Sequence, residues 1–140
     1  MIQRRTSTIS PPLPYSFNLT LERLSSFQRH IQVDLFSNGK YHRLFNINGI
    51  MLLATVYSIG TIEGPKLHVM IEGTQVSESD TTTILKMLKH TLSAPVSLHQ
   101  FYNQVSQDKA LSSIIEKLYA LHPAKTPTIF EALVQAIIGQ

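Results

Sequence analysis

The sequence predicts an α+β fold in which an antiparallel sheet comes first along the chain and helices follow. Between Val33 and Glu72, two Asn-Gly dipeptides separate extended segments, and this dipeptide suits the positive φ angles of a tight type I′ hairpin turn. After Asp80, the apolar residues recur at the spacing of a helix. This order of elements predicts an α+β unit followed by the opening of a helical domain.

The composition is that of an ordinary globular domain. The chain has 140 residues, of which 43% are hydrophobic and 15% charged. It has no cysteine, which excludes disulfides, thiolate nucleophiles and Cys-ligated zinc. No apolar run reaches the length of a membrane helix and residues 1–14 lack the apolar centre of a secretory signal, so we expect a cytoplasmic protein without a membrane partner. A net charge of +3 favours polyanions only weakly.

The N-terminal region divides into an arm and a first structured segment. Residues 1–14 include Arg4, Arg5 and three prolines but little that can be buried, so we expect a flexible arm. Tyr15 to Leu19 has a strand-like pattern, and a short helix is predicted to follow it with Thr20 as its N-cap.

Four further segments predict an antiparallel meander. The last segment, Lys66 to Glu72, alternates apolar and polar residues, as a strand does when one of its faces is buried. The third segment, Ile50 to Ile59, is apolar on both parities, which indicates a central strand. The segments are Val33 to Ser37, Lys40 to Ile47, Ile50 to Ile59 and Lys66 to Glu72.

The remaining chain is predicted to be helical. A first helix after Asp80 buries a stripe formed by Ile84, Leu85, Leu88 and Leu92. Ser97 to Ser106 is a weaker candidate, and Asp108 is expected to cap a helix from Lys109 to Leu121. Thr128 and Glu131 have the spacing of a capping box. They open a last helix with a broad apolar face made of Phe130, Leu133, Val134, Ile137 and Ile138.

The C-terminal segment resembles the start of the catalytic domain in the 3-methyladenine DNA glycosylase II family, which belongs to the helix-hairpin-helix DNA glycosylase superfamily. The residues that match the family's motif are Pro127, Phe130, Glu131, Leu133, Ile137, Ile138, Gly139 and Gln140. The preceding turn departs from the pattern, because Ala120-Leu121-His122-Pro123 stands where the family commonly has Gly-Leu-Arg-Pro. Upstream, Phe17 to Leu19, Gly39 to Arg43 and Lys66 to Ile71 match more weakly but in the right order.

This resemblance implies a domain organisation and a function. Residues 15–95 would form an N-terminal domain like half of a TATA-binding protein, an antiparallel sheet with two packed helices, and residues 96–140 the truncated opening of the helix-hairpin-helix glycosylase domain. The parent enzyme would act in base-excision repair, hydrolysing the N-glycosidic bond of alkylated bases in double-stranded DNA. The preferred base is not predicted, because the residues that shape the base pocket would lie mainly downstream.

The same resemblance implies that this segment is inactive alone. The superfamily grips DNA with a glycine-rich hairpin and uses a catalytic aspartate, which the resemblance places beyond Gln140. The glycines, at positions 39, 49, 60, 64, 73 and 139, form no such hairpin. We therefore assign no catalytic residue. The side chain that enters the DNA stack would follow Gly139 and Gln140, so these two are the expected DNA-binding residues.

No metal site or cofactor is predicted, because the six histidines never show the i, i+4 spacing of a helical metal pair. For the isolated segment, we expect that the apolar face of the last helix either pairs with a second copy through Thr128 to Gln140 or leaves this segment mobile. The alternative function is a non-enzymatic α+β module that oligomerises or binds DNA. A sheet gripping the minor groove would use Tyr41, Arg43 and Phe45, which share one parity.

Overall fold

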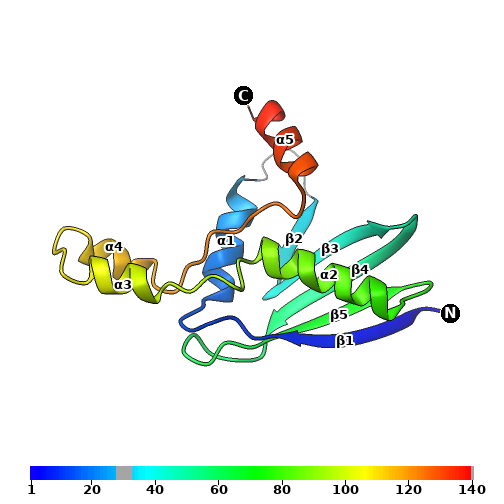
Figure 1. Ribbon diagram of the computed structural model, residues 1–140, viewed down its shortest axis with the longest axis horizontal. Coiled ribbons are helices and arrows are strands. Elements are labelled where there is room, and N and C mark those ends of the chain that lie inside the picture. Colours follow the sequence, from blue (N-terminus) through cyan, green and yellow to red (C-terminus); the bar gives the residue numbers. More distant parts are fainter. Residues whose placement is uncertain (28–32, 140) are drawn as a thin grey trace.

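The computed structural model describes residues 1–27 and 33–139 and confirms the α+β fold class (Figure 1). Its five strands form one antiparallel sheet in the order β1-β5-β4-β3-β2. The strands are β1 (Gln3–Ile9), β2 (Asp34–Ser37), β3 (Lys40–Ile47), β4 (Ile50–Ser58) and β5 (Leu67–Gly73). The helices are α1 (Phe17–Phe27), α2 (Glu78–Thr91), α3 (His99–Val105), α4 (Ser112–Lys117) and α5 (Ile129–Ile138).

Both predicted Asn-Gly turns join strands of the sheet. Asn38 and Gly39 have φ angles of 52° and 71°, and Asn48 and Gly49 have φ angles of 52° and 84°. Two successive positive φ angles define the type I′ turn, whose twist matches that of the paired strands. The strand boundaries predicted around these turns differ from the observed ones by one residue at most.

The core lies between one face of the sheet and the helices α1 and α2. It contains Phe17 and Leu21 of α1, Ile84 and Leu88 of α2, and inward side chains of the strands, among them Leu52, Val56, Val69 and Ile71. Because successive strand side chains point to opposite faces, Tyr41, Arg43 and Phe45 all point into this layer and are buried. These three side chains are therefore unavailable to a DNA minor groove. The alternative function in which they grip the minor groove is wrong for these residues.

The predicted flexible arm is wrong for Gln3–Ile9, which forms the edge strand β1. This strand pairs antiparallel with β5 along its whole length, from Gln3 opposite Gly73 to Ile9 opposite Leu67. Only Ile9 is buried, so the strand has no alternating apolar pattern for a sequence reading to detect. Backbone pairing with β5 and the ion pair between Arg4 and Glu72, whose Nη2 and Oε1 atoms are 2.7 Å apart, join it to the sheet.

The predicted strand from Tyr15 to Leu19 is wrong as well, because α1 begins at Phe17. Ser16 caps this helix in place of Thr20: its hydroxyl oxygen accepts a hydrogen bond from the Leu19 N–H at 3.4 Å. Thr20 lies inside the helix, where its hydroxyl donates to the Ser16 carbonyl at 2.8 Å.

The helices after the sheet are in the predicted order, but one is shorter than expected. Ser77 and Asp80 form a capping box at the start of α2. Asp108 accepts hydrogen bonds from the N–H groups of Ala110 and Leu111, yet helix α4 begins only at Ser112. It ends at Lys117, with Leu118 as its C-cap, and Ala120 beyond it adopts a positive φ of 66°. Helices α3 and α4 project from the side of the sheet domain, and α5 stands at its upper end (Figure 1).

Candidate functional site

Of the two predicted DNA-binding residues, Gly139 lies at the end of α5. Gly139 is exposed, adopts a helical conformation with φ −79°, and donates its N–H to the carbonyl of Gln135 at 2.9 Å. A Cβ atom there would lie 3.0 Å from the same carbonyl oxygen, so a side chain fits only with a small adjustment. Gln140 lies outside the described residues. The role of both residues in binding DNA remains a prediction.

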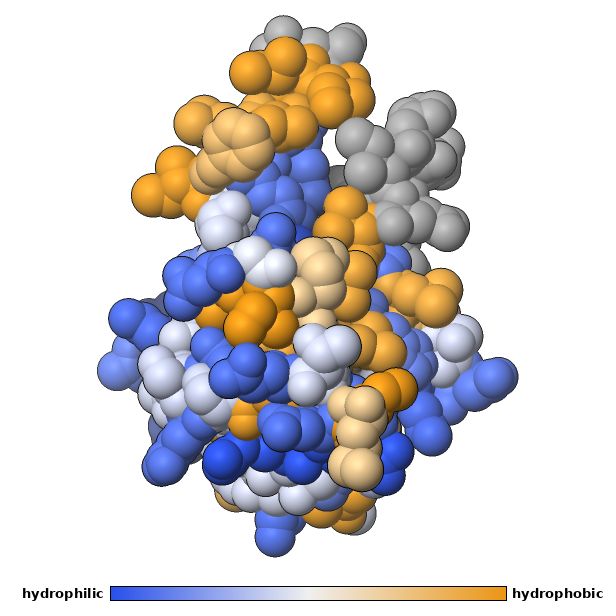
Figure 2. Space-filling view, turned by 90° about the vertical axis from the view of Figure 1, so that its right-hand side faces the viewer, coloured by the Kyte–Doolittle hydropathy of each residue, from blue (hydrophilic) through white to orange (hydrophobic). Residues whose placement is uncertain are grey.

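The apolar motif residues of α5 face solvent. None of the residues of this helix is buried, and Phe130 is 77% exposed, Ile137 69% and Ile138 54%. Hydrophobic side chains accordingly gather over α5 at the top of the molecule (Figure 2). Soluble monomers rarely leave so many large apolar side chains of one element exposed, which marks this face as an interaction surface.

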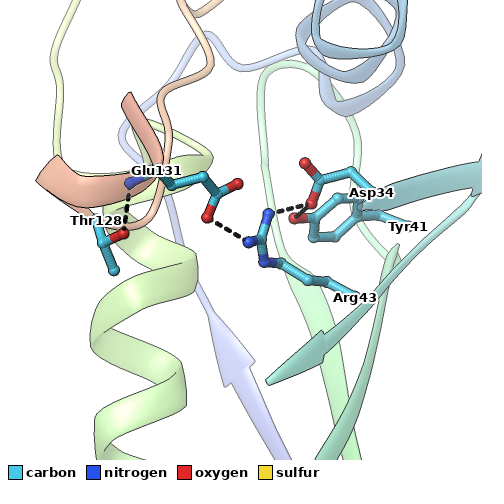
Figure 3. Close-up of polar contacts among 5 residues, drawn as sticks. All are labelled: Asp34, Tyr41, Arg43, Thr128 and Glu131. Atoms are coloured by element: carbon cyan, nitrogen blue, oxygen red, sulfur yellow. Dashed lines mark hydrogen bonds and ion pairs between the residues drawn. The ribbon is translucent and has the colours of Figure 1, made fainter. Parts of the chain in front are cut away.

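The polar motif residue of α5, Glu131, has a different role from its neighbours. Its carboxylate turns back toward the sheet, where Oε2 lies 2.6 Å from Nη2 of Arg43 (Figure 3). At the start of the same helix, the Thr128 hydroxyl oxygen accepts from the Glu131 N–H at 3.2 Å. The predicted capping box is thus half formed: Thr128 caps the helix, and the carboxylate pairs with Arg43.

Arg43 also binds a second carboxylate. Its Nη1 lies 2.7 Å from Oδ1 of Asp34, and the same oxygen accepts a hydrogen bond from the Tyr41 hydroxyl at 2.5 Å. The side chains of Arg43 and Asp34 are each 6% exposed, and that of Glu131 is 19% exposed. We call these four residues, Asp34, Tyr41, Arg43 and Glu131, the Arg43 cluster (Figure 3).

Burial and neighbouring charges shift the pKa of two side chains in the Arg43 cluster. Burial raises the pKa of the Tyr41 hydroxyl above its usual range, and the negative charge of Asp34 raises it further, so Tyr41 remains a neutral donor. Burial alone would lower the pKa of the Arg43 guanidinium, but the charges and hydrogen bonds around it, that of Asp34 foremost, raise it. The cluster thus carries two carboxylates and one cation. It holds α5 against β2 and β3.

Sequence reasoning missed this cluster, although a signal for it was present. Arg43 shares its parity with Tyr41 and Phe45, and an arginine on the buried face of a sheet requires an acidic partner. Asp34, opposite Arg43 in the β2–β3 register, is the near partner. Glu131 is 88 residues away in sequence, so only the folded chain reveals it.

The three aspartates that a search for catalytic carboxylates would consider have structural partners. Asp34 belongs to the Arg43 cluster, Asp80 accepts from the Ser77 N–H at 3.1 Å, and Asp108 caps the turn before α4. Hydrogen bonds from Ser77 lower the pKa of Asp80. Within residues 1–27 and 33–139, no group of three or more His, Asp or Glu side chains is placed to hold a metal ion. None of the described helices is long and apolar enough to cross a membrane.

Comparison with known proteins yields a likeness in fold. No protein-family model matches the sequence, and no curated protein matches it either. Among solved structures, the fold is similar to that of a 3-methyladenine DNA glycosylase from Archaeoglobus fulgidus, with a TM-score of 0.73 and 15% sequence identity. The match covers 96% of this chain and 44% of the archaeal chain, so this chain spans less than half the length of that protein.

Proposed function

We propose that this chain is the N-terminal part of a base-excision-repair DNA glycosylase, an enzyme that removes alkylated bases by hydrolysing the N-glycosidic bond. The observation that carries the proposal is the extent of the structural likeness. It covers 96% of the chain, and therefore extends beyond the sheet domain into the helical region where the glycosylase-like sequence motif lies. The likeness in fold and the sequence motif both support a DNA glycosylase.

Within such an enzyme, this segment would brace the catalytic body. The Arg43 cluster ties α5 to the sheet through Glu131, and the opposite, apolar side of α5 is free to pack against further helices. Because β1 belongs to the sheet, residues 3–95 would form the accessory domain, and residues 96–140 the opening of the catalytic domain. Double-stranded DNA would be the partner of the complete enzyme. An oligomerising module is the second candidate, and the exposed apolar face of α5 favours it.

Base release from alkylated DNA tests the proposal. The product of the complete reading frame and residues 1–140 alone are each incubated with a duplex containing one alkylated purine, and abasic sites are counted. We expect release by the complete product and none by residues 1–140, which have no assigned catalytic residue. An undamaged duplex and a protein-free sample are the controls. The proposal is overturned if the complete product releases no base, or if residues 1–140 suffice.

A further inference from the structure

A groove with basic walls runs along the outer side of α2. It joins two cavities of about 510 Å³ and 620 Å³, which share the side chains of Lys86 and His90. Lys89 and Lys125 line the first cavity, and the start of α5 closes the far end of the second. We call the surface formed by Lys86, Lys89, His90 and Lys125 the basic groove.

The basic groove is a local excess of positive charge. No carboxylate lines either cavity. Three of the chain's 12 Lys and Arg side chains lie here, and the other nine are balanced by the nine Asp and Glu residues. These three lysines give the surface a formal charge of +3. Each of the three lysines is exposed, and none takes part in an ion pair among the described residues.

The helix dipole of α2 does not explain this concentration of charge. Lys89 and His90 lie in the last turn of α2, where a cation is favoured by the negative end of the helix. Lys86 lies one turn earlier, and Lys125 comes from a separate segment of the chain. Lys125 is held in place by its N–H, which donates to the Thr91 carbonyl at 2.8 Å. The hydroxyl of Ser93 donates to the carbonyl of Pro123 and fixes the same segment.

The lining of the groove fits the backbone of a duplex. Lysine ammonium groups act as point charges for phosphates, and small apolar side chains such as Pro95 and Val96 can face the sugars. Neither cavity is lined by Phe, Tyr or Trp, the side chains on which unpaired bases stack. We propose that the basic groove binds the phosphodiester backbone of double-stranded DNA without reading its sequence. The choice of DNA as the polyanion rests on the proposed function.

Binding of a fluorescent, undamaged duplex to residues 1–140 at several salt concentrations tests this inference. If three lysines each neutralise one phosphate, raising the salt from 50 to 200 mM weakens binding about 40-fold. The variant Lys86→Gln/Lys89→Gln/Lys125→Gln is expected to lose at least tenfold in affinity at 50 mM salt and nearly all of the salt dependence. The arginine variant Lys86→Arg/Lys89→Arg/Lys125→Arg keeps the charge and should retain binding.

A matched control separates a defined surface from diffuse charge. Lys66→Gln/Lys109→Gln/Lys117→Gln removes the same charge at three exposed lysines outside the groove, and should retain affinity within about twofold. Equal losses in the two glutamine variants, or tighter binding of single-stranded RNA than of the duplex, would overturn the inference. Base release by the complete product is measured separately. If only the groove variant loses affinity and the complete product releases no base, the groove is supported and the glycosylase is contradicted. If the complete product releases base but the groove variant binds as tightly as the original chain, the groove alone is contradicted.

Discussion

Arg43 is the residue on which the attachment of α5 to the sheet depends. Replacing it by Met removes the only cation from a cluster that also holds the carboxylates of Asp34 and Glu131. Breaking a buried ion pair by removing one partner strands the other charge, so we expect Arg43→Met to lower the free energy of unfolding by about 3 kcal/mol. Urea denaturation measures the change. Glu131→Gln is the matched control, because it leaves Arg43 paired with Asp34 and should cost much less. An Arg43→Met variant as stable as the original would show that the cluster does not hold α5.

His122 is the second residue with a measurable consequence, since it is fully buried against the ring of Tyr15. Its Nε2–H donates to the Pro14 carbonyl at 3.1 Å, and burial lowers the pKa of the imidazole below its ordinary value of 6.5. Above pH 6.5 the ring is neutral in both the folded and unfolded chains, so its contribution to stability is complete. As the pH falls below 6.5, the unfolded chain takes up the proton first and the free energy of unfolding falls.

Replacement of His122 by Gln should remove part of this acid sensitivity. Urea midpoints measured between pH 7.5 and 5.5 are expected to fall less steeply for His122→Gln than for the original chain. His99→Gln, at an exposed position, is the control and should leave the slope unchanged. Identical slopes for the original chain and His122→Gln would show that His122 does not control stability in this range.

At the scale of elements, the sequence was informative wherever local chemistry determines the structure. The two Asn-Gly turns located β2, β3 and β4, because few residues tolerate consecutive positive φ angles. The alternation of apolar and polar residues in Lys66 to Glu72 identified β5, because a strand with one buried face shows this pattern locally. β1 could not be found in this way, because its pairing with β5 joins residues more than 55 positions apart and only Ile9 is buried. The start of α1 was misplaced because Ser16 and Thr20 are both residue types that can cap a helix, and the sequence alone did not show that Ser16 does so.

At the scale of the whole molecule, the candidate surfaces arise from residues distant in sequence. Lys125 reaches the lysines of α2 only because its segment returns to the end of that helix, and Glu131 reaches Arg43 only because α5 follows this segment. The sequence contained the motif around Glu131 but not the contact that the glutamate makes. The net charge of +3 was visible in the sequence, whereas the gathering of Lys86, Lys89 and Lys125 in one groove was not.

The exposed face of α5 leads to a prediction for the molecule as a whole. Burying a side chain the size of Ile or Phe stabilises a protein by about 1.5 to 3 kcal/mol, and Phe130, Leu133, Ile137 and Ile138 are all exposed on this helix. We expect residues 1–140 to associate through α5 at high concentration, which sedimentation would detect. Ile137→Lys/Ile138→Lys should yield a monomer with an intact sheet. Ile114→Lys/Leu118→Lys makes the same change on α4 and should leave association unaltered. A chain that is monomeric at every concentration, with amides in α5 as protected from hydrogen exchange as those of β4, would show that this face needs no partner.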